Sequence, residues 1–378
     1  MRHRSARIAT LATAAALAAT CLATTSAGAA PAPGPHSRTD DGPNSRTHNG
    51  LSNCTGTAPA PVVCHFDVAP GAYDVSVTLG GSAVESRTSV LAETRRAVLP
   101  ETVAAPGARV RRTFTVDVRT PEGEPTGPTG TPGLTLTFGG SAPALSSVRV
   151  RRAVHARQLL LLGDSTVCDQ PGEPYAGWGQ QLPQYLRQGI STANYADSGE
   201  SSVTYRENPA LFRTVQQKIR PGDLALIQLA HNDKQTDAPT YRANLTALVE
   251  GVRARGGRPV LVTPIVRRWF NADGTLNNPT ALLVNGLGVD HPAEIRALAT
   301  TLRTPLIDLT ALTKARVEAL GPEPSKALYL TAEKRDNTHT SVRGATEYAE
   351  LVLGELRTQR LLPRATVAGG GPPVIGAL

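Results

Sequence analysis

From about residue 156 onward, the apolar residues of this chain stop alternating with polar ones and form continuous runs. Such runs are typical of strands that are buried on both faces of a parallel sheet. Amphipathic helical patterns separate them, and alternating strands and helices predict a three-layer α/β/α domain with a parallel sheet over residues 153–365. The runs are QLLLLG (158–163), DLALIQLA (223–230), RPVLVTPI (258–265) and TPLIDL (304–309), and the helical patterns are YRANLTALVEGVRARG (241–256), HPAEIRALATTLR (291–303) and GATEYAELVLGELRTQR (344–360).

Before this change, residues 51–152 show a period of two. In GAYDVSVTLGG the apolar residues are Tyr73, Val75, Val77 and Leu79, and RRTFTVDVRT, GLTLTFGG and ALSSVRVRR alternate in the same way. Strict alternation indicates strands with one buried face, so this region is predicted to be a small β-sandwich. PEGEPTGPTGTPG, residues 121–133, is interpreted as a surface loop within it.

The two ends of the chain lack a core pattern. Residues 1–30 combine a basic start, an apolar stretch and small residues, which predicts a secretory signal peptide cleaved after Ala29 or Ala30 and a secreted protein. The alternative, a membrane anchor, is disfavoured because the apolar run is short and alanine-rich, and no later segment is apolar for long enough. Residues 31–50 are interpreted as a flexible leader and residues 366–378 as a mobile tail.

Charge and cysteines limit the possible partners. Removing residues 1–30, which carry Arg2, Arg4 and Arg7 and no acidic residue, lowers the formal net charge from +8 to +5. The remaining charges are dispersed, which argues against nucleic acid as a partner. They would suit an anionic polysaccharide, or they form an ordinary solvated surface. Cys54 and Cys64 flank a short loop that a disulfide could close, and the pairing is left open. Cys168 is interpreted as a packing residue. No cysteine or histidine cluster has zinc-type spacing.

Function in open parallel sheets is found at the carboxyl ends of the strands. The polar residues that follow the predicted strands, or that precede the last helix, are Asp164, Ser165, Asp197, Ser198, Gly199, His231, Asn232, Asp233, Asp336 and His339. Ser165 would need a base to become a nucleophile, and Asp336 could hold His339 for that role if the two lie on one turn. Three groups could stabilise an oxyanion: the N–H of Ser165, the N–H of Gly199 and the amide of Asn232. A helix starting at Ser165 would add a favourable field.

Four short segments carry a family resemblance: GDST at Ser165, NYADSGESS at Gly199, HND at Asn232 and DNTH at Asp336 and His339. In this order they resemble the SGNH, or GDSL-type, hydrolases over roughly residues 158–362. GDSTVCDQPGEPYAGWGQ and RRWFNADGTL resemble the rhamnogalacturonan acetylesterase branch, and FDVAPGAYDVSVTLGG and PALSSVRV resemble a galactose-binding-like domain.

The resemblance implies a flavodoxin-like SGNH hydrolase domain, catalytic Ser165, Asp336 and His339, and an oxyanion hole of Ser165, Gly199 and Asn232. It implies neither a metal nor a cofactor. Three departures from the family pattern, at Ala230, Thr340 and Cys168, bear on substrate preference.

Simpler roles exist for several of these residues. Ser165 could cap a helix, and His339 taken alone could be a surface or core histidine. The other polar candidates are interpreted as structural: Asp164 bonds loop amides, His231 packs the Asn232 loop, and His291 packs a helix start. Tyr175 and Trp178 could stack on sugar or pack the first helix, with the core role favoured for Trp178.

No G-x-S-x-G elbow or glycosidase carboxylate pair is found. Together with the resemblance, the sequence predicts a secreted esterase that removes acetyl groups from plant polysaccharide, foremost pectic rhamnogalacturonan. A monomer is favoured, and the oligomeric state stays open. Two alternatives stay open: an SGNH esterase for acetylated xylan, a short-chain lipid or a thioester, and a non-catalytic carbohydrate-binding protein.

Overall fold

The protein is described from a computed structural model that covers residues 48–128 and 130–367. The predicted signal peptide, residues 31–47 of the predicted leader and residues 368–378 of the predicted tail lie outside the described residues. Within this part of the chain, none of the helices has both the length and the apolar composition to cross a membrane.

The second half of the chain is built on a parallel five-stranded sheet. In spatial order its strands are β11 (Ile190–Asn194), β10 (Arg157–Gly163), β12 (Leu224–Gln228), β13 (Arg258–Val262) and β14 (Leu306–Ile307). The continuous apolar runs form these strands because both faces of the sheet are covered: Leu159 and Leu161 point into one core, and Leu160 and Leu162 into the other. The predicted parallel sheet is confirmed.

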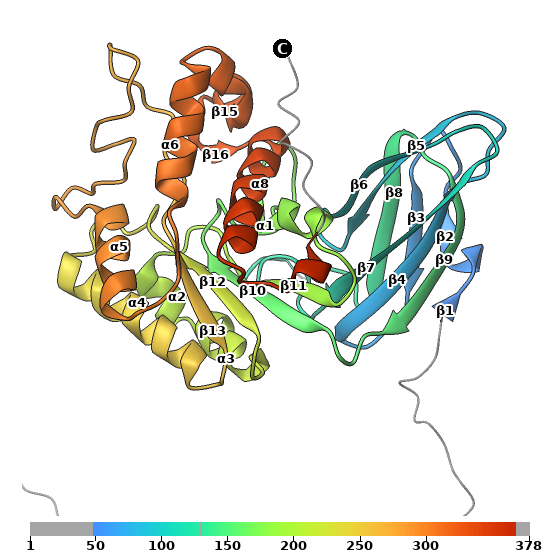
Figure 1. The fold of residues 1–378 in the computed structure, drawn as a ribbon, viewed down its shortest axis with the longest axis horizontal. Helices are drawn as coiled ribbons and strands as arrows, with labels where there is room; N and C mark the ends of the chain where they lie inside the picture. The colour runs from blue at the N-terminus through green and yellow to red at the C-terminus, as the bar shows by residue number, and fades with distance from the viewer. Residues whose placement is uncertain (1–47, 129, 368–378) are drawn as a thin grey trace, which may run out of the picture. The chain divides into compact units, whose positions relative to one another are not determined.

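Helices cover both faces of this sheet (Figure 1). One layer holds α1 (Trp178–Gln181), α6 (Leu309–Leu320) and α8 (Val342–Thr358), and the other holds α2 (Ser202–Glu207), α3 (Thr214–Lys218), α4 (Ala238–Arg253) and α5 (His291–Thr301). The predicted three-layer arrangement is therefore confirmed. Short helical segments connect the elements: 3-10 turns at Leu51–Asn53, Leu182–Tyr185, Pro324–Leu328 and Arg364–Thr366, a π turn at Pro209–Arg213, and α7 (Thr331–Lys334).

Residues 48–152, called the β-rich region below, form two antiparallel sheets. One has the order β1 (His48–Asn49), β9 (Leu145–Arg152), β4 (Gly71–Gly80) and β7 (Arg109–Val118); the other has the order β2 (Cys54–Thr55), β3 (Val62–Phe66), β8 (Leu134–Ala142), β5 (Ser86–Ala92) and β6 (Arg96–Ala104). Residues from both sheets share one apolar core, to which β4 contributes Tyr73, Val75, Val77 and Leu79, as its alternation predicts. The likeness to galactose-binding domains stays a prediction.

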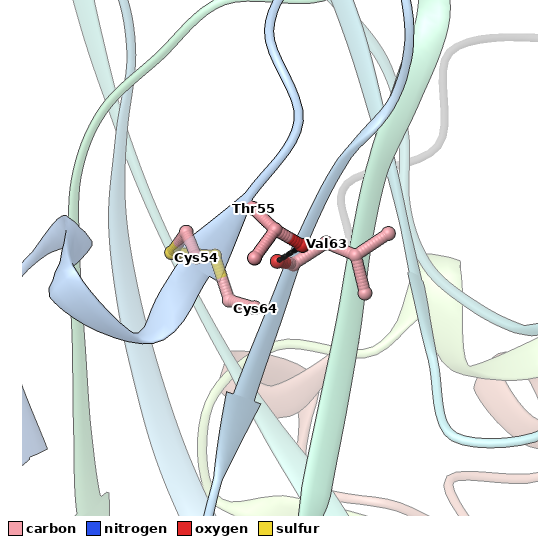
Figure 2. Close-up of a disulfide and its surroundings, with 4 residues drawn as sticks. All are labelled: Cys54, Thr55, Val63 and Cys64. Atoms are coloured by element: carbon pink, nitrogen blue, oxygen red, sulfur yellow. Dashed lines mark hydrogen bonds between the residues drawn. A yellow bond between two sulfur atoms is a disulfide. The ribbon is translucent and has the colours of Figure 1, made fainter.

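A disulfide joins the first two strands of the second sheet. Cys54 on β2 is bonded to Cys64 on β3, and the two residues are direct partners in the antiparallel pairing (Figure 2). Thr55 donates a hydrogen bond to the carbonyl of Val63 beside the bridge, at 3.5 Å. The sequence left this pairing open, and the structure contains it.

Both ends of the described chain extend beyond the predicted boundaries of the ordered regions. His48 and Asn49, assigned to the leader, pair with Val150 and Arg149 of β9. Val367, assigned to the tail, forms a β-bridge with Leu186 and is buried. Pairing through the main chain needs no apolar side-chain pattern, so these short extensions left no signal in the sequence.

A buried ion pair connects the β-rich region to the α/β region. Arg96 at the start of β6 donates from Nε to Asp169 at 2.9 Å, and both side chains are fully buried. Arg96 also donates to the carbonyl of Thr192 on β11, and Asn194 of that strand donates to the second oxygen of Asp169. The segment that follows β10 is thus held from both regions.

Candidate active site

Ser165 lies in a tight turn directly after β10. The N–H groups of Val167 and Cys168 both donate to the carbonyl of Asp164, and the Asp164 carboxylate accepts the N–H of Thr166 at 2.9 Å. The turn does not continue as a helix: the chain leaves it at Asp169, which pairs with Arg96, and α1 begins only at Trp178. The expectation that a helix begins at Ser165 and supplies a favourable electrostatic field there is therefore wrong.

The structure brings Ser165, His339 and Asp336 into one hydrogen-bonded chain. Ser165 Oγ lies 2.9 Å from His339 Nε2, and His339 Nδ1 lies 2.6 Å from the Asp336 carboxylate. Asp336 and His339 belong to β16 (Asp336–Thr340), which pairs with β15 (Tyr329–Leu330) rather than forming a helical turn. The pairing is irregular, because Leu330 faces Asp336 while Tyr329 faces Thr340, and this bulge lets the two side chains meet.

The Asp336 carboxylate is held in its ionised form. Burial acts to raise its pKa, but hydrogen bonds from the His339 side chain and from the N–H groups of His339 and Thr338 outweigh burial and lower the pKa to about 2. A carboxylate that stays charged can fix the orientation of the imidazole and stabilise it when it accepts a proton.

Two further predicted residues follow the strands on either side of β10. Gly199 comes after β11 with a φ of +83°, a conformation that favours glycine, and no atom beyond the adjoining residues lies within 4 Å of a Cβ at this position. Asn232 follows β12, and its amide donates to the carbonyl of Glu200 at 3.1 Å. An amide group has two N–H donors. Three adjacent strand ends therefore carry Ser165, Gly199 and Asn232.

Asp164 and His231 are buried at the strand ends that carry Ser165 and Asn232, and they have the structural roles the sequence suggested. The two buried side chains are 3.1 Å apart, between Asp164 Oδ2 and His231 Nδ1. Burial acts to raise the pKa of Asp164, but His231 and the Thr166 hydrogen bonds lower it. The carbonyl of His231, next to Asn232, accepts a hydrogen bond from Arg267.

The remaining aromatic and histidine candidates have mostly structural positions. Trp178 is buried and donates to Gln228 on β12, which confirms its core role. His291 is buried at the start of α5 and contacts the carbonyl of Leu283, as expected for helix-start packing. Tyr175 differs, because its ring packs against the His339 ring in a T-shaped arrangement with centroids 5.6 Å apart.

Among the departures from the family pattern, Ala230 is buried beneath the Asn232 segment. Thr340 is also buried, and its hydroxyl donates to the carbonyl of Ala176 at 2.6 Å. The N–H of Ala176 donates in return to the carbonyl of Thr340. This pair of bonds fastens β16 to the segment that carries Tyr175, next to His339.

Sequence reasoning missed Glu124, in the loop between β7 and β8. The Oε1 atom of Glu124 accepts from Ser198 Oγ at 2.5 Å and from Cys168 Sγ at 2.8 Å. The surface-loop interpretation of residues 121–133 is therefore wrong for its first half, and Cys168 is more than a packing residue. A signal existed, since connections of this length without regular structure are commonly functional.

The geometry as a whole suits acyl transfer. A serine hydroxyl, an imidazole and an ionised carboxylate form a relay in which a proton can leave the serine. The backbone N–H groups of Ser165 and Gly199 and the amide of Asn232 belong to the segments around that hydroxyl, where a tetrahedral oxyanion would need donors.

Comparison with known proteins agrees with this geometry. Residues 161–346 match the model of the GDSL-like lipase/acylhydrolase family. The chain is 37% identical over 211 residues to the rhamnogalacturonan acetylesterase RhgT of Bacillus subtilis, an alignment that covers 52% of this chain and 87% of that relative. The chain belongs to the GDSL-like lipase/acylhydrolase family. It is accordingly an ester hydrolase of the serine esterase type, as predicted.

A second relative is similar over both regions of the chain. The uncharacterized esterase YxiM of Bacillus subtilis is 30% identical over 311 residues, which covers 78% of this chain and 74% of the relative. The crystal structure of protein YxiM has a TM-score of 0.49 and 27% sequence identity, and covers 79% of this chain and 80% of that one.

Proposed function

We propose that this chain is a secreted carbohydrate acetylesterase whose substrate is acetylated pectic rhamnogalacturonan. The observation that carries the esterase chemistry is the chain of contacts from Ser165 Oγ through His339 to Asp336, at 2.9 Å and 2.6 Å. The similarity to the rhamnogalacturonan acetylesterase RhgT supports the choice of substrate.

In the first half of the reaction, Ser165 Oγ attacks the acetyl carbonyl carbon while its proton passes to His339 Nε2. The carbonyl oxygen becomes an oxyanion, which the N–H groups of Ser165 and Gly199 and the amide of Asn232 stabilise. His339 then gives the proton to the sugar oxygen as the ester bond breaks. The polysaccharide leaves with a free hydroxyl, and the acetyl group remains on Ser165.

In the second half, water attacks the acetyl-enzyme and loses its proton to His339. A second oxyanion forms in the same place and collapses, and the proton passes from His339 to Ser165 Oγ. Acetate is released and the enzyme returns to its starting state. Asp336 stays ionised throughout and stabilises the imidazolium formed in each half.

A polysaccharide substrate is supported by an exposed aromatic residue near the relay. Trp269 is 53% exposed. The N–H of its neighbour Arg268 donates to the carbonyl of Asn337, which follows Asp336 directly. An exposed indole at this edge offers a flat apolar face that a sugar ring can cover.

Secretion is supported by two features. The basic, apolar and small-residue pattern of residues 1–30 is typical of a cleaved signal peptide. The Cys54–Cys64 disulfide of the β-rich region suits an oxidising compartment.

The basic net charge of the chain suits the uronic acid groups of pectin.

The test is acetate release from acetylated rhamnogalacturonan and acetylated xylan, alongside p-nitrophenyl esters with acyl chains of two to twelve carbons. We expect the highest kcat/KM on rhamnogalacturonan, and no acetate from a folded Ser165→Ala variant. Undiminished release by that variant would exclude Ser165 as the nucleophile. A preference for xylan or for long acyl chains would replace the proposed substrate and keep the esterase chemistry.

A further inference from the structure

One carboxylate of the β-rich region lies at the candidate active site. Glu124 lies in the loop between β7 and β8, and its Oε1 atom accepts two hydrogen bonds from the α/β region. Ser198 Oγ donates at 2.5 Å and Cys168 Sγ donates at 2.8 Å. One oxygen atom from the β-rich region therefore holds two separate segments of the other region.

Both of these segments carry groups of the proposed oxyanion hole. Ser198 directly precedes Gly199. Cys168 shares the turn of Ser165, since its N–H donates to the carbonyl of Asp164 and its sulfur lies 3.6 Å from the carbonyl of Ser165. The bonds of Glu124 thus connect the segments on which two oxyanion donors lie.

The Gly199 segment needs such restraint because little packs against it. Ser198 and Gly199 are both exposed, and no atom beyond the adjoining residues lies within 4 Å of the position a Cβ would take on Gly199. Fixed points exist on either side: Asn232 holds the carbonyl of Glu200, and Thr126, from the Glu124 loop, donates to the buried Asp197. Ser198 lies between them, and its hydroxyl is held by Glu124.

The Cys168 contact is that of a neutral thiol. Burial, together with the neighbouring Glu124 carboxylate, raises the pKa of Cys168 well above its usual value. The sulfur therefore keeps its proton and donates it toward the carboxylate. A thiolate here would repel Glu124 instead of bonding to it.

We propose that Glu124 is a positioning residue for the esterase reaction, acting through Ser198 and Cys168 to set the donors of the oxyanion hole. The inference rests on the proposed function. It assigns the β-rich region a part in turnover that is separate from any binding of substrate. Misplacing a catalytic donor by about 1 Å can cost on the order of a hundredfold in rate.

The experiment compares kcat and KM for acetate release by Glu124→Ala, Glu124→Gln and Ser198→Ala. We expect Glu124→Ala to lower kcat about tenfold or more, with KM within about twofold of the wild-type value, because the donors matter most in the transition state. Glu124→Gln should recover most of kcat, since a single amide oxygen can accept both hydrogen bonds. Ser198→Ala should lower kcat, and adding it to Glu124→Ala should cost little more.

Glu101→Ala is the matched control, because Glu101 on β6 likewise accepts from a serine, Ser141, but within the β-rich region. It should leave kcat unchanged. An unchanged kcat in Glu124→Ala, or a rise in KM alone, would overturn the proposal. If Glu124→Ala fails to fold, a normal kcat for Ser198→Ala or a failure of Glu124→Gln to retain activity does the same. If the wild type releases no acetate, or if Ser165→Ala still releases acetate, the proposed function is refuted instead.

Discussion

Asp336 contacts both the imidazole and the main-chain N–H of His339. One carboxylate oxygen lies 2.6 Å from His339 Nδ1, and the other accepts the main-chain N–H of the same residue at 3.0 Å. The ring is thereby left with Nε2 directed at Ser165 Oγ. Because Asp336 both bonds the main chain of β16 and orients the imidazole of His339, substituting it tests the relay directly.

We expect Asp336→Asn to lower kcat by about 10²–10⁴, because an amide cannot stabilise the imidazolium and allows the wrong tautomer. Since hydrogen bonds lower the pKa of Asp336 to about 2, its protonation should not limit the wild-type rate at pH 4 to 8. Asp273→Asn is the control, because Asp273 bonds Thr275 in a similar local turn on an exposed loop. Steady-state acetate release across this pH range checks both points, and a loss of only a few-fold would remove Asp336 from the relay.

The amide of Asn232 is expected to contribute directly to the oxyanion. Asn232→Ala should lower kcat on the order of 10²–10³-fold with little change in KM, as when a single oxyanion donor is removed. Asn285→Ala provides the comparison, since the Asn285 amide also donates to loop carbonyls, those of Asp233 and Thr236. Equal effects of the two substitutions on kcat would show that Asn232 only holds its loop.

The sheet and the relay could be predicted because each leaves a local mark on the sequence. A strand covered on both faces has to be apolar throughout, as Leu159–Leu162 are, and the residues that follow it lie at one edge of the sheet. The helix α6 left a weaker mark. Its buried residues are Leu309, Thr310, Thr313 and Val317, and two threonines on the buried face blur the amphipathic pattern.

Other features depend on contacts between distant parts of the chain. The residues Ser165, Thr166 and Val167 could begin a helix or form a turn. The chain leaves the turn at Asp169, and the partner of Asp169, Arg96, is far away in sequence. Glu124 has the same character. An acidic residue in a loop rich in glycine and proline looks solvated until the fold places Ser198 and Cys168 beside it.

The Arg96–Asp169 ion pair should matter for stability. Arg96→Ala leaves the buried Asp169 carboxylate without its nearest cation, which should lower the free energy of unfolding by about 3 kcal/mol or more. Arg87→Ala is the comparison, because it breaks an exposed ion pair with Glu85 in the β-rich region. It should lower the free energy of unfolding by less than about 1 kcal/mol. Denaturant unfolding of the wild type and the two variants measures the difference, and equal losses would mean that the buried pair contributes no more than the exposed one.

A pH dependence of stability is expected from Glu93, in the turn between β5 and β6. Both of its carboxyl oxygens are buried, and burial, aided by nearby Glu122 and opposed by Arg96, raises its pKa to about 9. The folded protein therefore binds a proton that the unfolded chain has lost above about pH 4.5. Stability should be fully present below that pH and should fall as the pH rises toward 9, by at most about 1.4 kcal/mol per pH unit.

Glu93→Gln should flatten this slope, because the glutamine is neutral at every pH while it keeps the size of the side chain. The measurement is the free energy of unfolding between pH 5 and 8.5, and the matched control is Glu85→Gln, since the Glu85 side chain is about half exposed. That control should keep the wild-type slope. An equally steep slope in Glu93→Gln would show that Glu93 is ionised in the folded protein, with Arg96 outweighing burial.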